Sequence, residues 1–252
     1  MRTTKYLQKL ADAMNIHGPS LGIGVAITAV SILGAFFVLN LYSSENDIPS
    51  AETKLAETSE KQVKQSNMDA SLFSGKTTSL LGSSNAPITV IEFGDYQCFF
   101  CNKFFHNTEA EIVKNYVDTG KVKIIFKDFT IIGPDSLIAA HATHCANEEG
   151  KFWEYHDILY TSWTGENNGW ASLDNLHKFA KQIGLGEKAF SDCMSSGRYN
   201  SVVEQSNLDA NTLGLTGTPD FFIVGTDNTV EKIVGAQPYE VFEKIFESKL
   251  KK

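Results

Sequence analysis

The sequence predicts an α/β domain in which a block of helices interrupts a small sheet. Short apolar runs, bounded by turn-forming residues, stand at both ends of the region that begins near Leu80. Between them lies a long region with helical character, which glycines divide into segments. The expected order is therefore β-α-β, a helical block, and then β-β-α.

Each element follows from a local pattern. Residues 88–93 and 122–126 read as buried strands, and residues 99–117 read as the helix between them. The helical block runs over residues 136–213, with breaks at Gly150, 165–169, 184–186 and Gly197. Residues 221–224 and 230–234 form two further strands around a turn, and residues 239–250 form a closing amphipathic helix. No internal repeat is evident.

Composition limits the possible partners. The chain has 252 residues, 42% of them hydrophobic, which suits one domain of ordinary size with appendages. Its formal net charge is −8, and no basic block occurs outside the first few residues. Nucleic acid is therefore not expected as a partner.

The N-terminal region predicts a membrane anchor. Residues 21–42 are uncharged, apolar and long enough to span a bilayer; basic residues precede them and acidic residues follow. This pattern places the tail, residues 1–20, in the cytoplasm, and the polar tether, residues 43–79, outside it. A cleaved signal peptide is the alternative, but its apolar region is shorter and ends in small residues. A buried core helix is a weaker alternative.

The most informative motif is Cys98-Phe99-Phe100-Cys101, which lies between a predicted strand and a predicted helix. A thiol at a helix N-terminus faces free backbone N–H groups, which favour the reactive thiolate. Two cysteines three residues apart share a helical face, so one sulfur can attack the other. Half of a zinc site has the same spacing, but the sequence contains no second such pair. Redox chemistry is therefore favoured.

Glu92 interrupts the apolar run that precedes the motif. Burial disfavours the charged form of a carboxyl group, so its pKa is expected to rise. Such a group could accept and return the proton of the second thiol. The alternative is a glutamate on the solvated face of an edge strand.

Two segments, residues 86–101 and 216–224, resemble the DsbA-type thioredoxin-fold disulfide oxidoreductases. Cys145 and the segments 151–157 and 190–193 resemble the helical insertion of that family. The resemblance implies a thioredoxin core, residues 80–133 and 215–252, with an inserted helical domain, residues 134–214, after the second core strand. One transmembrane helix would precede this fold. Phe100 departs from the pattern, because DsbA-like oxidants typically carry histidine there.

The resemblance also implies roles for residues. Cys98 would be the nucleophile, Cys101 the resolving thiol and Glu92 the buried acid. The peptide bond between Thr218 and Pro219 would be cis and lie against the active pair, where the Thr218 backbone could pair with an extended substrate. From their place between the two cysteines, Phe99 and Phe100 are also expected to contact the substrate, together with Thr218 and Pro219. No cofactor or metal is expected.

Cys145 and Cys193 lie on different predicted helices. Outside the cytoplasm, two remaining cysteines usually form a disulfide. Two buried free thiols are one alternative. A metal site made of His141, His144 and Cys145 is another, although no fourth ligand is evident.

The expected function is that of a membrane-tethered, extracytoplasmic thiol–disulfide oxidoreductase. Its partners would be unfolded or reduced substrate proteins and a quinone-linked membrane protein that reoxidises the pair. A reductase or isomerase that runs in the opposite direction, a non-catalytic tethered chaperone and a metal-binding domain are the alternatives.

Overall fold

A computed structural model describes residues 79–251 of the chain. The expected tail, the expected membrane span and, except for Ser79, the expected tether lie outside these residues. Within residues 79–251, no helix combines the length and the apolar character that a membrane span requires.

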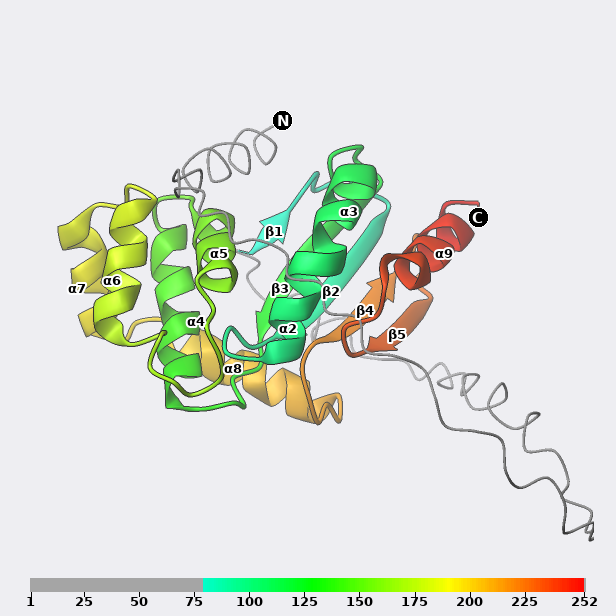
Figure 1. Ribbon diagram of the computed structural model, residues 1–252. Helices are drawn as coiled ribbons and strands as arrows, with labels where there is room; N and C mark the ends of the chain where they lie inside the picture. Colours follow the sequence, from blue (N-terminus) through cyan, green and yellow to red (C-terminus); the bar gives the residue numbers. More distant parts are fainter. Residues whose placement is uncertain (1–78, 252) are drawn as a thin grey trace, which may run out of the picture. The chain divides into compact units, whose positions relative to one another are not determined.

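The centre of the fold is a five-stranded mixed sheet with the order β1-β3-β2-β4-β5 (Figure 1). Strands β2 and β3 are parallel, and the other neighbouring pairs are antiparallel. β2, which leads to the Cys98 motif, is therefore the central strand. The strands are β1 Leu80–Leu81, β2 Ile88–Gly94, β3 Val122–Asp128, β4 Asp220–Val224 and β5 Val230–Val234.

One face of the sheet is covered by the helix after β2 and by α9, Tyr239–Leu250 (Figure 1). The first of these helices runs without interruption through α2 Phe99–Phe104, η3 Phe105–Glu109, α3 Ala110–Ile112 and η4 Val113–Val117. Apolar side chains from both helices and from β2, β3, β4 and β5 form the core on this face. The carboxyl-terminal part of α8 packs on the other face, where Ala210 belongs to the same apolar cluster as Ile91 and Phe93 of β2.

The inserted region lies between β3 and β4 and consists of five helices (Figure 1). They are α4 Pro134–Asn147, α5 Phe152–Thr161, α6 Leu173–Gln182, α7 Glu187–Ser196 and α8 Asn200–Thr212. Their apolar core also contains Tyr96, Cys98 and Cys101, so the inserted region packs directly on the turn that carries the CxxC motif.

The predicted order of elements is confirmed, and the breaks predicted at the glycines separate the inserted helices. Two features differ from the prediction. The short strand β1 was not expected, and two parts of the predicted 99–117 helix have π-helical hydrogen bonding. A strand of two residues is too short for a periodic pattern to reveal.

Candidate active site

Cys98 is the N-cap residue of α2. Its N–H donates a hydrogen bond to the carbonyl oxygen of Asp95 at 3.0 Å, and its carbonyl oxygen accepts one from the N–H of Asn102 at 3.0 Å. Cys98 and Cys101 are both free thiols and both buried. The predicted position of the pair, at the junction between the central strand and the following helix, is therefore the observed one.

The two thiols differ in acidity. The pKa of Cys98 is lowered to about 6, first by a hydrogen bond from the Cys101 thiol, against the opposing effect of burial. The Thr218 side chain and the backbone N–H groups of Cys101 and Phe100 lower it further. Burial and the neighbouring Cys98 raise the pKa of Cys101 well above its ordinary value. At neutral pH the negative charge therefore resides on Cys98 and the proton on Cys101.

The loop before β4 faces the first thiol. The peptide bond between Thr218 and Pro219 is cis, as the resemblance implied. The Cys98 sulfur lies 3.3 Å from the carbonyl oxygen of Thr218, close enough for the protonated thiol to donate a hydrogen bond to that oxygen. The structure thus brings Thr218, Pro219 and the Cys98 motif together.

Glu92 lies in the middle of β2, opposite Phe126 of β3 on one side and Phe221 of β4 on the other. An edge-strand position is therefore excluded. Because side chains alternate along a strand, Glu92 shares the sheet face of Val90, which is the face that α2 covers. Burial, and next the charge of Cys98, raise the pKa of Glu92 far above the usual carboxyl range. Glu92 is therefore protonated at mildly acidic pH.

A second buried carboxyl group, Glu109 on η3, was not predicted as part of the site. Burial raises its pKa, the nearby His156 lowers it, and the charge of Glu92 raises it again. One oxygen of Glu109 and the Nε2 atom of His156 are buried without a hydrogen-bond partner. The sequence signal was weak, because Glu109 lies in a polar part of a predicted helix.

The turn between β2 and α2 is held by Asp95 and Gln97, which sequence reasoning also missed. One oxygen of the Asp95 carboxylate accepts the N–H of Gln97 at 2.8 Å, and the other accepts the N–H groups of Ile131 and Ile132 at 2.8 and 2.9 Å. The Gln97 side chain donates to Ser136 Oγ at 3.1 Å. An aspartate after a strand-ending glycine is typical of such a turn and was an available signal.

Phe99 and Phe100 are the exposed part of the motif. The two residues are 49% and 53% exposed, and their rings meet edge to face with centroids 5.3 Å apart. The ring of Trp163, from the inserted region, lies 6.0 Å from that of Phe99. These aromatic residues form an apolar surface beside Cys98.

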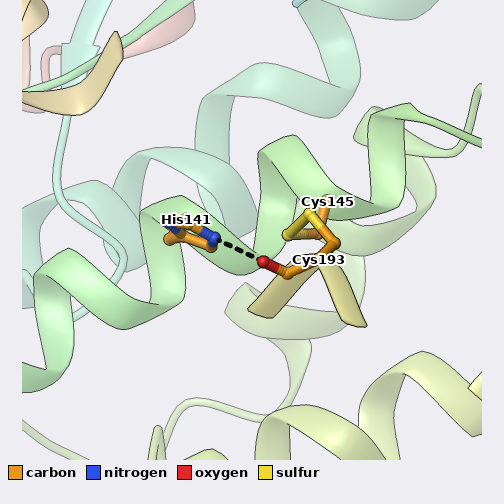
Figure 2. A group of neighbouring side chains, drawn as sticks. All are labelled: His141, Cys145 and Cys193. Atoms are coloured by element: carbon orange, nitrogen blue, oxygen red, sulfur yellow. Dashed lines mark hydrogen bonds between the residues drawn. A yellow bond between two sulfur atoms is a disulfide. The ribbon is translucent and has the colours of Figure 1, made fainter. Parts of the chain in front are cut away.

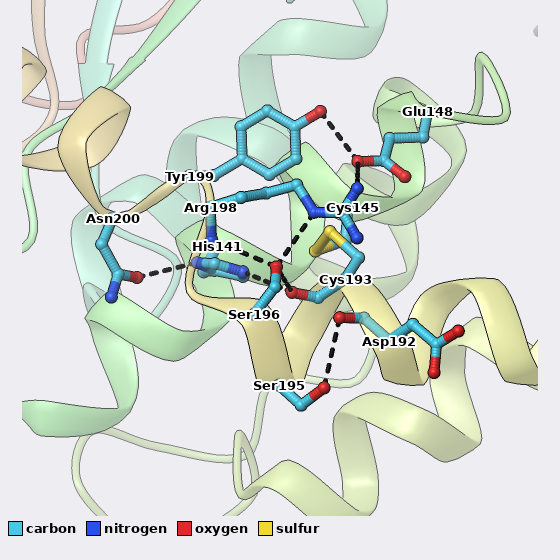
Figure 3. Close-up of a disulfide and its surroundings, with 10 residues drawn as sticks. All are labelled: His141, Cys145, Glu148, Asp192, Cys193, Ser195, Ser196, Arg198, Tyr199 and Asn200. Atoms are coloured by element: carbon cyan, nitrogen blue, oxygen red, sulfur yellow. Dashed lines mark hydrogen bonds and ion pairs between the residues drawn. A yellow bond between two sulfur atoms is a disulfide. The ribbon is translucent and has the colours of Figure 1, made fainter.

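The other two cysteines form a disulfide that joins α4 to α7. The sulfur atoms of Cys145 and Cys193 are 2.06 Å apart, and 48 positions separate the residues in the sequence (Figure 3). Both residues are buried in the core of the inserted region. Tyr199 and Arg198 bind the carboxylate of Glu148 nearby, at 3.1 and 3.2 Å (Figure 3).

The three residues suggested as metal ligands, His141, His144 and Cys145, do not form one site, because His141 and His144 have different partners. His141 lies beside the disulfide, with Nε2 3.3 Å from the carbonyl oxygen of Cys193 (Figure 2). His144 instead pairs with Asp128, with 2.7 Å between Nε2 and Oδ2. The possible ligand atoms of His141, Cys145 and Cys193 lie within 4.8 Å of one another, but the two sulfurs are bound to each other. Because both sulfurs are bonded to each other, neither is a free thiolate that could bind a metal at this site.

A family profile described as Thioredoxin matches residues 74–247, which is more than half of the chain. The chain belongs to the thioredoxin family. Disulfide bond formation protein D of Bacillus subtilis is 26% identical over 175 residues, which cover 68% of this chain and 77% of that protein.

Two solved structures agree with this assignment. Oxidised BdbD from Bacillus subtilis is 26% identical with a TM-score of 0.62, over 69% of this chain and 92% of that one. α-DsbA1 from Wolbachia pipientis is 28% identical with a TM-score of 0.60, over 68% and 89%. The chain is thus a DsbA-like protein-disulfide oxidoreductase with a thioredoxin fold and an inserted helical region.

Proposed function

We propose that this thioredoxin-family protein oxidises dithiols of unfolded substrate proteins through the Cys98–Cys101 pair. The observation that carries the proposal is the unequal acidity of the two thiols at the start of α2. A disulfide is an oxidant when its reduced form is stabilised, and a stable thiolate on the nucleophilic cysteine provides that stabilisation. The lowered pKa of Cys98 therefore supports the oxidising direction.

The exchange has two steps. A substrate thiolate attacks the Cys98 sulfur of the oxidised pair, so a substrate–Cys98 disulfide forms and the Cys98–Cys101 bond breaks. Cys101 leaves with the electron pair. A second substrate thiolate then attacks the substrate sulfur of the mixed disulfide, and Cys98 leaves as a thiolate. The substrate has lost two electrons, and the active pair has gained them.

The proton for the leaving Cys101 sulfur is assigned to Glu92. A buried sulfur with a raised pKa does not remain a thiolate, so it needs a donor on its own side of the fold. Glu92 lies on the sheet face beneath α2, and its charge is felt by Cys101. With its own pKa raised, Glu92 can hold this proton in the oxidised protein and recover it when Cys101 is reoxidised.

Substrate binding is assigned to the surface around Cys98. The exposed rings of Phe99 and Phe100 offer apolar contacts to an unfolded chain. The backbone of Thr218, which already faces the Cys98 sulfur, could pair with an extended segment as an added strand.

The location of the enzyme is part of the proposal. The apolar segment 21–42 and the charges on either side of it support an uncleaved anchor with the catalytic domain outside the cytoplasm. The Cys145–Cys193 disulfide is consistent with an oxidising compartment. A membrane partner that accepts electrons would return Cys98 and Cys101 to the disulfide.

The experiment that tests this function is oxidation of a reduced, unfolded protein by the purified domain, followed as loss of substrate thiols. The wild-type protein is expected to oxidise about one dithiol per molecule, and Cys98→Ser none. A Cys98→Ser protein that still suppresses substrate aggregation, beside a wild-type protein that oxidises nothing, would favour the chaperone instead. Acceleration of disulfide reshuffling without net oxidation would favour the isomerase.

A further inference from the structure

The loop between α5 and α6, residues 162–172, is bound to the active turn. Trp163 Nε1 donates a hydrogen bond to the carbonyl oxygen of Gln97 at 2.8 Å. The backbone N–H of Asn167 donates to the Gln97 side-chain oxygen at 3.0 Å, and the Asn167 side chain donates to the carbonyl oxygen of Ile132 at 3.0 Å. This α5–α6 loop therefore joins the inserted region to the residues next to Cys98.

In the α5–α6 loop, the residues before and after Glu166 both have positive φ angles. Glu166 stands between Gly165, whose φ of 138° is adopted almost only by glycine, and Asn167, whose φ of 52° lies in the left-handed region that asparagine tolerates. A Cβ atom on Gly133 would meet Asn167 Oδ1 at 1.9 Å, so the loop packs directly on the backbone that precedes α4. The position of Glu166 is therefore restricted by the backbone conformation of its two neighbours and by the close packing of Asn167 on Gly133.

Glu166 accepts a hydrogen bond from the backbone N–H of Phe99, with 2.9 Å between Oε1 and the nitrogen. Phe99 is the first residue of α2, so this N–H is one of those that the helix itself leaves free. The next two amides, those of Phe100 and Cys101, interact with the Cys98 sulfur. At the start of α2, the first free N–H therefore binds the Glu166 carboxylate, and the next two interact with the Cys98 sulfur.

We propose that Glu166 is a positioning residue that fastens the α5–α6 loop to the active helix and limits the oxidising strength of the Cys98–Cys101 pair. The inference rests on the proposed exchange at that pair. Glu166 is exposed, and its side chain contributes a formal negative charge. It is bound to the residue next to Cys98, so its charge opposes a second negative charge on that sulfur. A less stable thiolate means a less stable reduced form, and hence a weaker oxidant.

Two substitutions separate the charge from the hydrogen bond. Glu166→Gln keeps an oxygen that can accept the Phe99 N–H and removes the charge, whereas Glu166→Ala removes both. Asp174→Asn is the matched control, because it removes an exposed carboxylate from the first turn of α6, in the same inserted region. Circular dichroism would verify that all three variants are folded.

The readouts are the thiolate titration of Cys98, followed by ultraviolet absorbance, and the equilibrium constant of the pair with glutathione. In Glu166→Gln we expect the acid dissociation constant of Cys98 and the constant for glutathione oxidation each to rise about two- to fivefold, as for a charge removed at a helix terminus. Glu166→Ala should give a rise at least as large, and Asp174→Asn none. High salt should bring the wild-type protein closer to Glu166→Gln, because it screens the charge.

Unchanged or lowered constants in both Glu166 variants would overturn the proposal and leave Glu166 as a structural contact of the loop. This outcome is distinct from a failure of the proposed function. The titration reports on the Cys98 thiolate whether or not the wild-type protein oxidises substrates, whereas the proposed function fails if the wild-type protein gives no net oxidation of a reduced substrate.

Discussion

The thiol of Cys98 lies 3.3 Å from the carbonyl oxygen of Thr218, although 120 positions separate the two residues in the chain. The whole inserted region lies between them in sequence. The antiparallel pairing of β2 with β4 brings the two segments together, because Phe93 near the end of β2 pairs with Asp220 at the start of β4. The sheet register therefore places a backbone segment before β4 against the reactive sulfur.

The acidity of Cys98 predicts how the reduced protein reacts with iodoacetamide. The rate of alkylation at Cys98 should rise with pH, reach half of its maximum near pH 6, and level off above that pH, because the thiolate is the reactive form. Cys101 should stay protected over this range, since its pKa is raised. Mass spectrometry of peptides after timed alkylation measures the rate at each of the two cysteines. A midpoint near the ordinary thiol value of about 8.5 would contradict the assignment.

The lowered pKa of Cys98 also makes the stability of the reduced protein depend on pH. The pKa of Cys98 is lower in the folded state than in an unfolded chain, so its contribution is fully present above the unfolded value and is lost as pH falls through about 6. Denaturant unfolding of reduced wild-type protein and of Cys98→Ser, compared over this range, measures the contribution. Parallel pH profiles would show that the thiolate does not stabilise the fold.

Glu92→Gln should slow turnover by about 100-fold, the lower end of the usual range for general acid–base catalysis. It should also change the stability profile. The raised pKa of Glu92 means that the wild-type protein loses stability as pH rises from the ordinary carboxyl pKa toward the raised one, and the amide removes this loss. The variant should still lose some stability as pH rises, because the pKa of Glu109 is raised as well and Glu109 remains in the variant. Unchanged exchange rates across the pH range would make Glu92 a structural residue.

Phe100→His should make the pair a stronger oxidant. A histidine before Cys101 can offer the Cys98 thiolate a charge or a hydrogen bond, which phenylalanine cannot, and the exposed position leaves room for the ring. A charge-assisted hydrogen bond is worth about 1.5–3 kcal/mol, which corresponds to roughly 30–60 mV for a two-electron couple. Equilibration with glutathione measures the shift, and Phe100→Leu is the neutral control. Equal potentials in both variants would contradict this reasoning.

Replacement of Cys145 and Cys193 by alanine should destabilise the protein by about 4 kcal/mol in the chain-entropy account, given the 48-residue separation. Chemical denaturation of the non-reduced double variant and the wild-type protein measures the difference. The Cys98 titration should stay close to that of the wild type, because the disulfide joins α4 to α7 and not the active turn. Free alkylation of both cysteines in folded, non-reduced wild-type protein would disprove the pairing.

Local patterns were sufficient to predict most of the fold. The apolar runs at β2, β3, β4 and β5 and the glycines between the inserted helices are visible within short windows of sequence. The π-helical segments were not, because η3 and η4 have ordinary helical composition and differ only in which carbonyl each N–H reaches. A longer window would not have revealed β1 either, since only its pairing with β3 defines it.

The candidate site was predicted where its chemistry is local and missed where it depends on distant contacts. Cys98, Cys101 and Glu92 lie within ten residues and carry their signal in type and spacing. Glu166 reaches the helix start from 67 positions away, and no pattern around it differs from that of a polar loop. Pairings of that kind come from tertiary packing, which a single sequence does not display.

The most direct test of the central claim is to trap the covalent intermediate on Cys101→Ser. This variant keeps the attacking sulfur and lacks the group that would release the product, so it should accumulate mixed disulfides with an unfolded, disulfide-containing protein. Peptide mapping should find the substrate linked to Cys98, with no such adduct in the Cys98→Ser/Cys101→Ser double variant. Equal amounts of adduct in both variants, or none in Cys101→Ser, would contradict the assignment of Cys98 as the nucleophile.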